Sequence, residues 1–230
     1  MSAPTLSIIV PVYNEARTIA RVAARLLALL FPTEELEIIV VNDGSTDGTH
    51  AALLPFLPRI TGITLEKNFG KGAAVRAGLE YARGTYCVVH DADEEYAPEE
   101  IPTLLRALQN RSDADAVYGS RNLTPTGRGY RRYVLGAWAL TQCVNFCFGT
   151  RLTDVYSCYK LMRTDLFRSL RLASKGFEVE IEITARLLKN KKKIIEMPIS
   201  YAPRAFCEGK KIRPQDGVKG LAALLRIVLE

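Results

Sequence analysis

Apolar residues recur in the first half of the chain as short β-rich runs separated by helical patterns. The runs are L-S-I-I-V-P-V at 6–12, L-E-I-I-V-V-N-D at 36–43, I-T-G-I-T-L-E at 60–66, T-Y-C-V-V-H-D at 85–91 and A-D-A-V-Y-G-S at 114–120. Strands that alternate with helices need crossover connections, so this order predicts an α/β fold with a mainly parallel sheet. Between the first two runs, apolar side chains form one helical stripe: Ile19, Val22, Ala23, Leu26, Leu27 and Leu30.

Residues 133–150 form an uncharged stretch flanked by Arg131-Arg132 and Arg151. The stretch just reaches the length of a membrane span. Gln142, Asn145 and two glycines within it favour a buried or membrane-surface helix instead.

The segment F-E-V-E-I-E-I at 177–183 alternates like a strand but continues into T-A-R-L-L-K-N, which favours a helix. Periodicity alone leaves its type open. No internal repeat, low-complexity tract or long linker interrupts the chain, so we predict a single domain over residues 1–230.

The composition is that of an ordinary soluble domain, with 48% hydrophobic and 24% charged residues among 230. Charge is unevenly distributed. Residues 1–115 contain 10 Lys and Arg against 16 Asp and Glu, a net charge of −6, whereas residues 116–230 contain 21 against 9, a net charge of +12. The basic half suits phosphates, nucleic acid or an anionic membrane, although the run at 191–193 is equally explained as a solvated basic face.

The five cysteines are an odd number without C-x-x-C spacing, which favours reduced thiols in a cytosolic protein. No signal-peptide pattern opens the chain, because Met1 leads directly into a strand-like run. We therefore expect the catalytic face to meet the cytoplasm.

Four acids crowd the end of the fourth run, in V-V-H-D-A-D-E-E-Y at 88–96. Ligands of open parallel sheets bind beyond the carboxyl ends of the strands, and P-V-Y-N-E at 11–15 and N-D-G-S-T-D-G at 42–48 should lie at the same edge. Two carboxylates in D-x-D spacing can hold one hard divalent cation whose other positions are filled by phosphate oxygens. The acids therefore indicate a ligand crevice.

Three better-known nucleotide and metal motifs are excluded. N-F-G-K-G at 68–72 lacks the first glycine and the Ser or Thr of a Walker loop, and no glycine follows the first strand as a dinucleotide fingerprint requires. The segments at 43–48 and 91–96 lack, respectively, the final glutamate and the central glycine of an EF-hand.

The order I-I-V-P-V-Y-N-E, V-V-N-D-G-S-T-D-G-T, N-F-G-K-G-A-A-V-R-A-G, D-A-D resembles family 2 glycosyltransferases of the GT-A fold. In the second half, G-S-R, T-D-V-Y-S-C-Y-K, S-K-G-F-E-V-E-I-E and M-P-I-S-Y-A-P-R resemble the dolichol-phosphate mannosyltransferase branch and its polyprenyl-phosphate relatives. The resemblance covers nearly the whole chain. It implies a nucleotide-sugar-binding half at 1–115 and an acceptor-binding half at 116–230.

On the donor side, the resemblance implies that Pro11, Tyr13 and Glu15, together with Asp43, hold the base and ribose of a nucleotide diphosphate sugar. Taken alone, Asp43 could be a turn residue and Glu15 a helix N-terminal acid. Lys71 would approach the diphosphate at a helix N-terminus.

The resemblance makes Asp91 and Asp93 the catalytic metal ligands for Mg²⁺ or Mn²⁺. Glu95 stands where this branch commonly has glutamine, and it is a candidate third ligand.

On the acceptor side, a polyprenyl or dolichyl phosphate would need fixed cations. The candidates are Arg121, Arg131, Arg204 and Lys210, with Arg132 and Lys211 beside them. A phosphate oxygen is already ionised and needs no strong base. A hydroxyl acceptor on a glycan is the alternative, and it would need a base among Asp154, Glu178 and Glu180.

The expected reaction is thus an inverting, metal-dependent transfer of a hexose to a polyprenyl phosphate by a peripheral protein at the cytoplasmic membrane face. The expected partners are the nucleotide sugar, the lipid phosphate and the membrane surface, with room for a membrane-anchoring partner and no nucleic acid. Cys158 and Cys207 stand at family Ser or Gly positions, which keeps a non-catalytic nucleotide-sugar-binding scaffold open.

Overall fold

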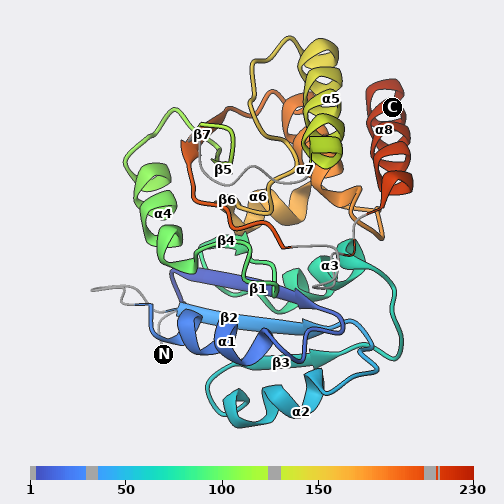
Figure 1. Cartoon of the computed structure of the whole chain (residues 1–230). Helices are drawn as coiled ribbons and strands as arrows, with labels where there is room; N and C mark the ends of the chain where they lie inside the picture. The colour runs from blue at the N-terminus through green and yellow to red at the C-terminus, as the bar shows by residue number, and fades with distance from the viewer. Residues whose placement is uncertain (1–3, 30–35, 124–130, 205–210, 212) are drawn as a thin grey trace.

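The computed structural model describes residues 4–29, 36–123, 131–204, 211 and 213–230 (Figure 1). Its seven-stranded sheet has the order β3-β2-β1-β4-β6-β5-β7. The strands are β1 (Leu6–Val12), β2 (Leu36–Asn42), β3 (Thr61–Thr64), β4 (Tyr86–Val89), β5 (Ala116–Ser120), β6 (Lys160–Arg163) and β7 (Ile194–Pro198).

All five strands expected from the sequence are present within a few residues of their predicted ends. Strands β1, β2, β3 and β4 are mutually parallel, as are β5 and β7. Strand β6 runs antiparallel between β4 and β5. The sequence did not predict β6 (K-L-M-R) or β7 (I-I-E-M-P), because both lie within the irregular second half, where charged residues interrupt the few apolar positions.

Helices cover both faces of the sheet. They are α1 (Ile19–Leu27), α2 (Thr49–Leu53), α3 (Lys71–Tyr81), α4 (Ile101–Gln109), α5 (Arg131–Phe148), α6 (Thr164–Ser169), α7 (Val179–Lys189) and α8 (Pro214–Leu229), with short 3-10 turns at Leu54–Phe56 and Pro98–Glu100.

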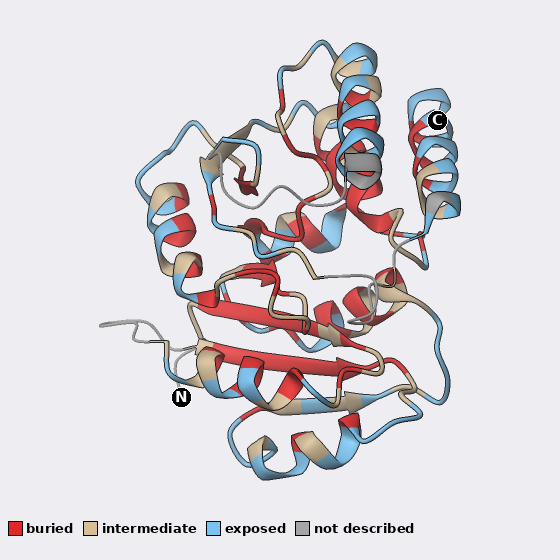
Figure 2. Ribbon diagram, viewed as in Figure 1, coloured by how far each residue is buried: buried red, intermediate tan, exposed pale blue. Residues whose placement is uncertain are grey.

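Alternate residues of the central strands supply the two halves of the core. Leu6, Ile8 and Val10 of β1 pack with α1, α2 and α4 on one face, and Ile9 packs with α3, α6 and α7 on the other. Strands β1 and β2 are accordingly buried along almost their whole length (Figure 2). This arrangement is the GT-A type of α/β fold.

The ambiguous segment at 177–183 is helical from Val179 onward, where it belongs to α7. Its alternation does not separate an inner from an outer face, because Val179, Glu180, Ile181 and Glu182 are all buried. The two glutamates are tolerated inside because each is ion-paired. The strand-like pattern therefore reflects buried ion pairs on a helix.

Helices α5, α7 and α8 share a third, smaller core that includes Leu140, Val144, Ile181, Leu224 and Ile227. Helices α5 and α8 lie side by side at the end of the molecule away from β3 (Figure 1). None of the helices in the described ranges is long and apolar enough to cross a bilayer. The uncharged stretch is thus a helix that packs on one face and is exposed on the other, as expected for a surface helix.

Candidate active site

The loops that follow β1, β2 and β4 converge at one edge of the sheet. The backbone N–H of Asp43 donates to the Val12 carbonyl at 2.8 Å, and the backbone N–H of Glu15 donates to the Thr49 hydroxyl at 2.8 Å. The Thr18 hydroxyl donates to the Ala92 carbonyl at 2.7 Å, which joins the first loop to the D-A-D segment. The polar strand ends predicted from the sequence therefore meet.

Asp43 is buried and holds the next loop in place. Its carboxylate oxygens accept the backbone N–H groups of Phe69 and Gly70, each at 2.8 Å. Both oxygens of Asp43 thus hold the following loop in place. This role goes beyond that of the simple turn residue that the position of Asp43 before Gly44 suggested. Its expected contact with the nucleotide is not among these bonds.

Glycines set the start of α3 and thereby the position of Lys71. Gly70 has φ +99°, in the left-handed region, and a Cβ there would lie 2.4 Å from the Lys175 carbonyl oxygen. A Cβ on Gly72 would come equally close to the Ser174 carbonyl oxygen. The helix N-terminus therefore packs directly on segment 174–175, and the Lys71 side chain enters the crevice.

Lys71 lies between two carboxylates. Its Nζ is 2.6 Å from Asp91 Oδ1 and 2.8 Å from Glu180 Oε1. Glu180 Oε2 in turn lies 2.5 Å from Lys160 Nζ. Burial alone would raise the pKa of Asp91, but the Lys71 ammonium holds that pKa below its ordinary value. Asp91 is therefore fixed in its ionised form.

Cys158 is buried next to Asp91, and its side chain helps to lower the pKa of that carboxylate. Burial raises the pKa of the thiol well above its usual value, so the group is neutral. A neutral thiol adds no competing charge beside the carboxylate. The departure at Cys158 is thus compatible with an intact site.

Asp93 and Glu15 share one guanidinium. Arg204 Nη1 and Nη2 lie 3.0 and 3.1 Å from the two carboxylate oxygens of Glu15, and Nη2 is also 3.1 Å from Asp93 Oδ2. Burial, followed by the charges of Asp91 and Glu95, raises the pKa of Asp93 to about 7. One arginine thus only partly neutralises this cluster of acids.

Glu95 holds the segment that carries this arginine. Its Oε2 accepts the Tyr201 hydroxyl at 2.5 Å, and its Oε1 accepts the backbone N–H of Arg204 at 2.9 Å. The backbone N–H of Ala202 also bonds to the Glu95 carbonyl. Both carboxylate oxygens therefore contact segment 201–204, and the role of Glu95 as a third metal ligand stays a prediction.

The other donor-side candidates lie beside this cluster. Pro11 is within β1 opposite Val41, and Tyr13 follows the strand. Lys211 Nζ bonds to the Tyr13 carbonyl, lies 2.5 Å from Glu15 Oε1, and stands 5.9 Å from the centroid of the Tyr13 ring. The Glu15 carboxylate thus pairs with two cationic side chains, those of Arg204 and Lys211.

Arg121 forms a two-bonded pair with Asp154, through Nε to Oδ2 at 2.7 Å and Nη2 to Oδ1 at 2.9 Å. Its guanidinium also lies 5.0 Å from the ring centroid of Tyr201, whose hydroxyl bonds to Glu95. Burial opposes the charge on Asp154, but Arg121 keeps the pKa of that carboxyl below its ordinary value. Arg121 is therefore a fixed cation that the Tyr201 ring separates from Glu95.

Three basic candidates and one cysteine have side chains outside the described part of the structure. Arg131 begins α5, but its side chain lies outside the described part of the structure, as does that of Arg132. Lys210 and Cys207 fall outside the described residues.

The acids fit a divalent cation by charge. Asp91 and Asp93 lie at one strand end, and the pKa of Asp93 is raised by burial and then by the charges of Asp91 and Glu95, which Arg204 offsets only in part. Within the described ranges, no three His, Cys, Asp or Glu residues form a ready-made metal cluster. A cation would therefore be held by Asp91 and Asp93, and it would need further oxygen ligands from another molecule bound at the site.

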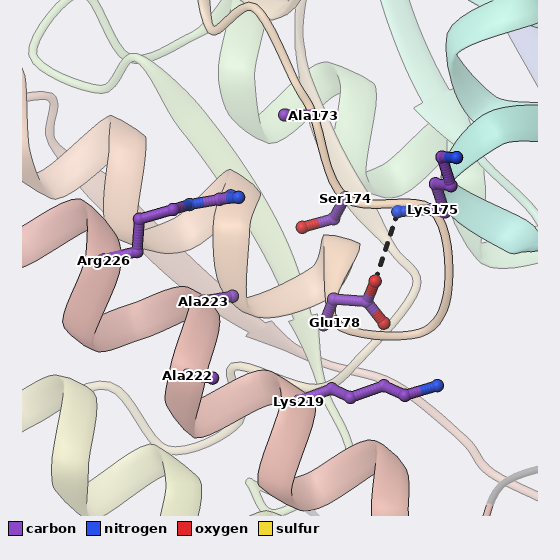
Figure 3. Close-up of a pocket in the computed structure, with 8 residues that line it drawn as sticks. All are labelled: Ala173, Ser174, Lys175, Glu178, Lys219, Ala222, Ala223 and Arg226. Atoms are coloured by element: carbon purple, nitrogen blue, oxygen red, sulfur yellow. Dashed lines mark hydrogen bonds between the residues drawn. The ribbon is translucent and has the colours of Figure 1, made fainter.

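A separate cleft of about 410 Å³ lies between α8 and segment 173–178 (Figure 3). Lys219 and Arg226 project into it from α8, and Glu178 faces them from the start of α7. Glu178 Oε1 accepts the backbone N–H groups of Lys175 and Gly176 at 3.1 and 2.9 Å. The cleft is therefore basic on its α8 side.

The structure adds three residues that the sequence did not single out for these roles. Tyr201 links Glu95 to Arg121, Lys160 supports Glu180, and Glu180 supports Lys71. The only signal for Glu180 and Lys160 was a charged residue within an otherwise apolar run.

The sequence pattern of the glycosyl transferase family 2 matches residues 7–171. The chain belongs to this family. The match includes the strand ends that carry Glu15, Asp43, Asp91 and Asp93. The protein is a glycosyltransferase, and its resemblance to the polyprenyl-phosphate branch is supported by its relatives.

Curated relatives extend the similarity over most of this family 2 glycosyltransferase. The chain is 31% identical over 221 residues to an undecaprenyl-phosphate mannosyltransferase of Micrococcus luteus, covering 88% of this chain and 85% of the relative. It is 31% identical over 210 residues to a polyprenol monophosphomannose synthase of Mycolicibacterium smegmatis, covering 86% and 77%.

Among solved structures, a glucosyl-3-phosphoglycerate synthase from Mycobacterium tuberculosis aligns with a TM-score of 0.77 at 24% identity. The alignment covers 98% of this chain and 80% of the other. That protein was crystallised with Mn²⁺, uridine diphosphate and glucosyl-3-phosphoglycerate. At this identity the likeness establishes the shared fold.

Proposed function

We propose that this family 2 glycosyltransferase transfers a hexose from a nucleotide diphosphate sugar to a polyprenyl or dolichyl phosphate, with inversion at the sugar. The relatives named for undecaprenyl phosphate and polyprenol support this choice of acceptor. The observation that carries the proposal is the ion pairing of the two buried carboxylates on the acceptor side, Asp154 with Arg121 and Glu180 with two lysines.

These carboxylates are poorly placed to act as general bases, because their oxygens already contact cations that an acceptor hydroxyl would have to displace. A phosphate acceptor has no need of one. Its ionised oxygen attacks the anomeric carbon, the bond from that carbon to the diphosphate breaks, and the nucleoside diphosphate leaves with the bonding electron pair. The chain would contribute mainly orientation and fixed charge.

Asp91 and Asp93 would hold the divalent cation, Mg²⁺ or Mn²⁺, which neutralises the leaving diphosphate when bound. The Mn²⁺ present in the structural neighbour supports a metal requirement for the shared fold. Lys71 would lie at the diphosphate end of the site, and Tyr13, Glu15 and Asp43 would line the nucleotide end. Metal binding at Asp93 requires Arg204 to move away, since the Arg204 guanidinium contacts the Asp93 carboxylate.

Acceptor cations are proposed on the side opposite the acids. Arg121 is held by Asp154 and stacked on Tyr201, so its charge is fixed near the crevice at little further entropic cost. Arg204, once displaced from the acids, would be the second cation near the sugar. Arg131 and Lys210 remain candidates of the same kind.

A peripheral position at the cytoplasmic membrane face is part of the proposal. Helix α5 exposes Leu135, Trp138 and Phe146, the last at 91%, and neighbouring α8 exposes Leu225 and Leu229. Exposed positions run along both helices in Figure 2. Lys219 and Arg226 on α8 add positive charge at the edge of these residues. Adjacent apolar stripes flanked by cations suit the interface of an anionic bilayer.

The hydroxyl-acceptor alternative is favoured by one observation, because Glu178 Oε2 is buried without a hydrogen-bond partner in the structure. That oxygen could accept a proton from an acceptor hydroxyl. The two candidates differ in what they transfer to and in which residue is indispensable.

The test begins with thermal-shift screening of GDP-mannose, UDP-glucose and UDP-GlcNAc with Mn²⁺, since a ligand that binds only the native state raises its melting temperature. The stabilising donor is then supplied in radiolabelled form with either undecaprenyl phosphate or a free glycan. We expect label in the lipid fraction only when metal is present. Transfer to glycan hydroxyls that is lost in Glu178→Gln would overturn the phosphate-acceptor proposal.

A further inference from the structure

Four charged groups form a continuous row from the crevice into the protein interior. Asp91, Lys71, Glu180 and Lys160 alternate in sign, with contacts of 2.6, 2.8 and 2.5 Å between successive partners. The exposed fraction of the side chains falls along the row, from 22% at Asp91 to 10% at Lys71, 4% at Glu180 and 1% at Lys160. Glu180 is thus the first member shielded from the crevice.

We infer that Glu180 is a positioning residue that keeps the Lys71 ammonium in place when Asp91 turns its carboxylate to a divalent cation. The inference rests on the proposed function, in which Asp91 holds that cation. When Asp91 also serves as a metal ligand, the cation draws on the same carboxylate charge that holds Lys71 at Oδ1. Lys71 then needs a second carboxylate close by, and Glu180 is already 2.8 Å away.

Electrostatics give this second anchor its effect on metal binding. A divalent cation at Asp91 repels a lysine that lies within 3 Å of the same carboxylate, and the charge of Glu180 offsets that repulsion. Without Glu180, Lys71 would depend on Asp91 alone and would compete with the metal for it. Removal of Glu180 should therefore weaken metal binding even though Glu180 never touches the metal.

A purely structural reason for the buried pair is weaker. Well-packed apolar residues of similar volume are often as stabilising as a buried ion pair, because desolvation cancels much of the attraction. Lys160 is almost wholly buried and is also bonded to the Ser157 carbonyl, so it fixes Glu180 from the interior. Because Lys160 holds one oxygen of Glu180, the other oxygen is directed at Lys71.

The test measures Mn²⁺ binding by titration of the full chain, alone and with GDP or UDP, in wild type and Glu180→Gln. We expect Glu180→Gln to bind Mn²⁺ about 10- to 100-fold more weakly, the usual effect of removing an outer partner of a metal ligand. Its melting temperature should also fall, because Lys160 is left buried without a counter-charge.

The double variant Glu180→Gln/Lys160→Met separates positioning from stability. It removes one acid and one cation, so the net charge of the row is unchanged and no unpaired charge remains inside. We expect its melting temperature to recover toward that of wild type while Mn²⁺ binding stays weak. It also serves as the test if Glu180→Gln alone fails to fold.

Glu37→Gln is the matched control. Glu37 is a similarly buried acid that pairs with Arg83 and accepts the Ser7 hydroxyl at the start of β2, opposite the strand ends that form the crevice. Its substitution should lower the melting temperature and leave Mn²⁺ affinity unchanged.

Two outcomes distinguish this inference from the function on which it rests. If wild type binds Mn²⁺ and the double variant binds it equally well, Glu180 is only structural and the inference is wrong. If wild type itself fails to bind Mn²⁺ with either nucleotide, the metal-dependent function fails first.

Discussion

Arg204 and Glu15, which are 189 residues apart in the chain, form a guanidinium–carboxylate pair with two hydrogen bonds of 3.0 and 3.1 Å. The same guanidinium reaches Asp93, while Glu95 fixes the backbone of Arg204. A cation from the acceptor half thus covers acids of the donor half. Ligand binding and movement of this arginine should therefore be coupled.

Replacement of Arg204 by methionine tests that coupling. We expect Mn²⁺ to bind about tenfold more tightly, because the competing bond to Asp93 is lost and hydrogen bonds between charged groups contribute roughly 1.5–3 kcal/mol. Sugar transfer should nevertheless fall, since the phosphate loses a cation. Titration with Mn²⁺ and a transfer assay measure the two effects.

Arg25→Met is the control for Arg204, because Arg25 pairs with the exposed Glu99 on the outer surface. It should alter neither quantity. Equal Mn²⁺ affinity in wild type and Arg204→Met would contradict the idea that Arg204 competes with the metal.

Asp93→Asn should abolish metal-dependent transfer and make the metal-free protein more stable at alkaline pH. The folded-state pKa of Asp93 is raised to about 7, above its ordinary value near 4. The folded state therefore binds this proton more tightly than the unfolded state, and stability falls as pH rises between about 4 and 7. Asparagine removes that loss.

Melting temperatures in EDTA at pH 5 and pH 8 measure the effect. The advantage of Asp93→Asn over wild type should be larger at pH 8. Asp113→Asn is the comparison, because Asp113 is an exposed acid whose pKa is lowered by Arg111 and Lys193, so its replacement should bring no alkaline gain. Full transfer activity in Asp93→Asn would refute the metal-site assignment.

Arg121→Ala should destabilise the protein as well as impair transfer. Asp154 is 1% exposed, and removal of its arginine leaves a buried charge unpaired, at a cost of about 3–5 kcal/mol. Arg121→Met/Asp154→Leu should recover most of that stability, and urea unfolding measures it. The double variant should still lose about 10- to 100-fold in kcat/KM for a polyprenyl phosphate, with donor binding unchanged.

Wild-type kcat/KM in that folded double variant would show that Arg121 serves Asp154 alone. Loss of donor binding would instead place Arg121 on the nucleotide side.

Phe146→Ser/Leu229→Ser should reduce binding to vesicles that contain anionic lipid, since it removes two of the most exposed apolar side chains of α5 and α8. Wild-type binding should weaken in high salt, because surface attraction is screened over about 8 Å at physiological ionic strength. Co-sedimentation measures both. Leu54→Ser, on the opposite side of the sheet, is the control, and equal binding of all three proteins to neutral and anionic vesicles would contradict the proposed membrane face.

The local pattern of the chain determined the α/β fold and the five strands β1 to β5. It also determined that the polar ends of β1, β2 and β4 meet at one edge of the sheet. These features follow from side-chain periodicity and from the geometry of parallel sheets. Both can be recognised from a few consecutive residues of the sequence. Strands β6 and β7 and the helical state of 177–183 were decided by tertiary structure. Short strands gain their stability from neighbours, and the buried glutamates of α7 are stable only opposite cations, Lys71 of α3 for Glu180 and both Arg186 of α7 and Arg226 of α8 for Glu182.

The same division holds for the site. The sequence placed Asp91 and Asp93 at a ligand crevice, because their type and spacing suit a metal wherever the strand ends. It could not tell that Glu95 holds segment 201–204, that Asp154 holds Arg121, or that Glu180 holds Lys71. Which charges pair depends on distances between residues far apart in the chain, and only folding sets those distances.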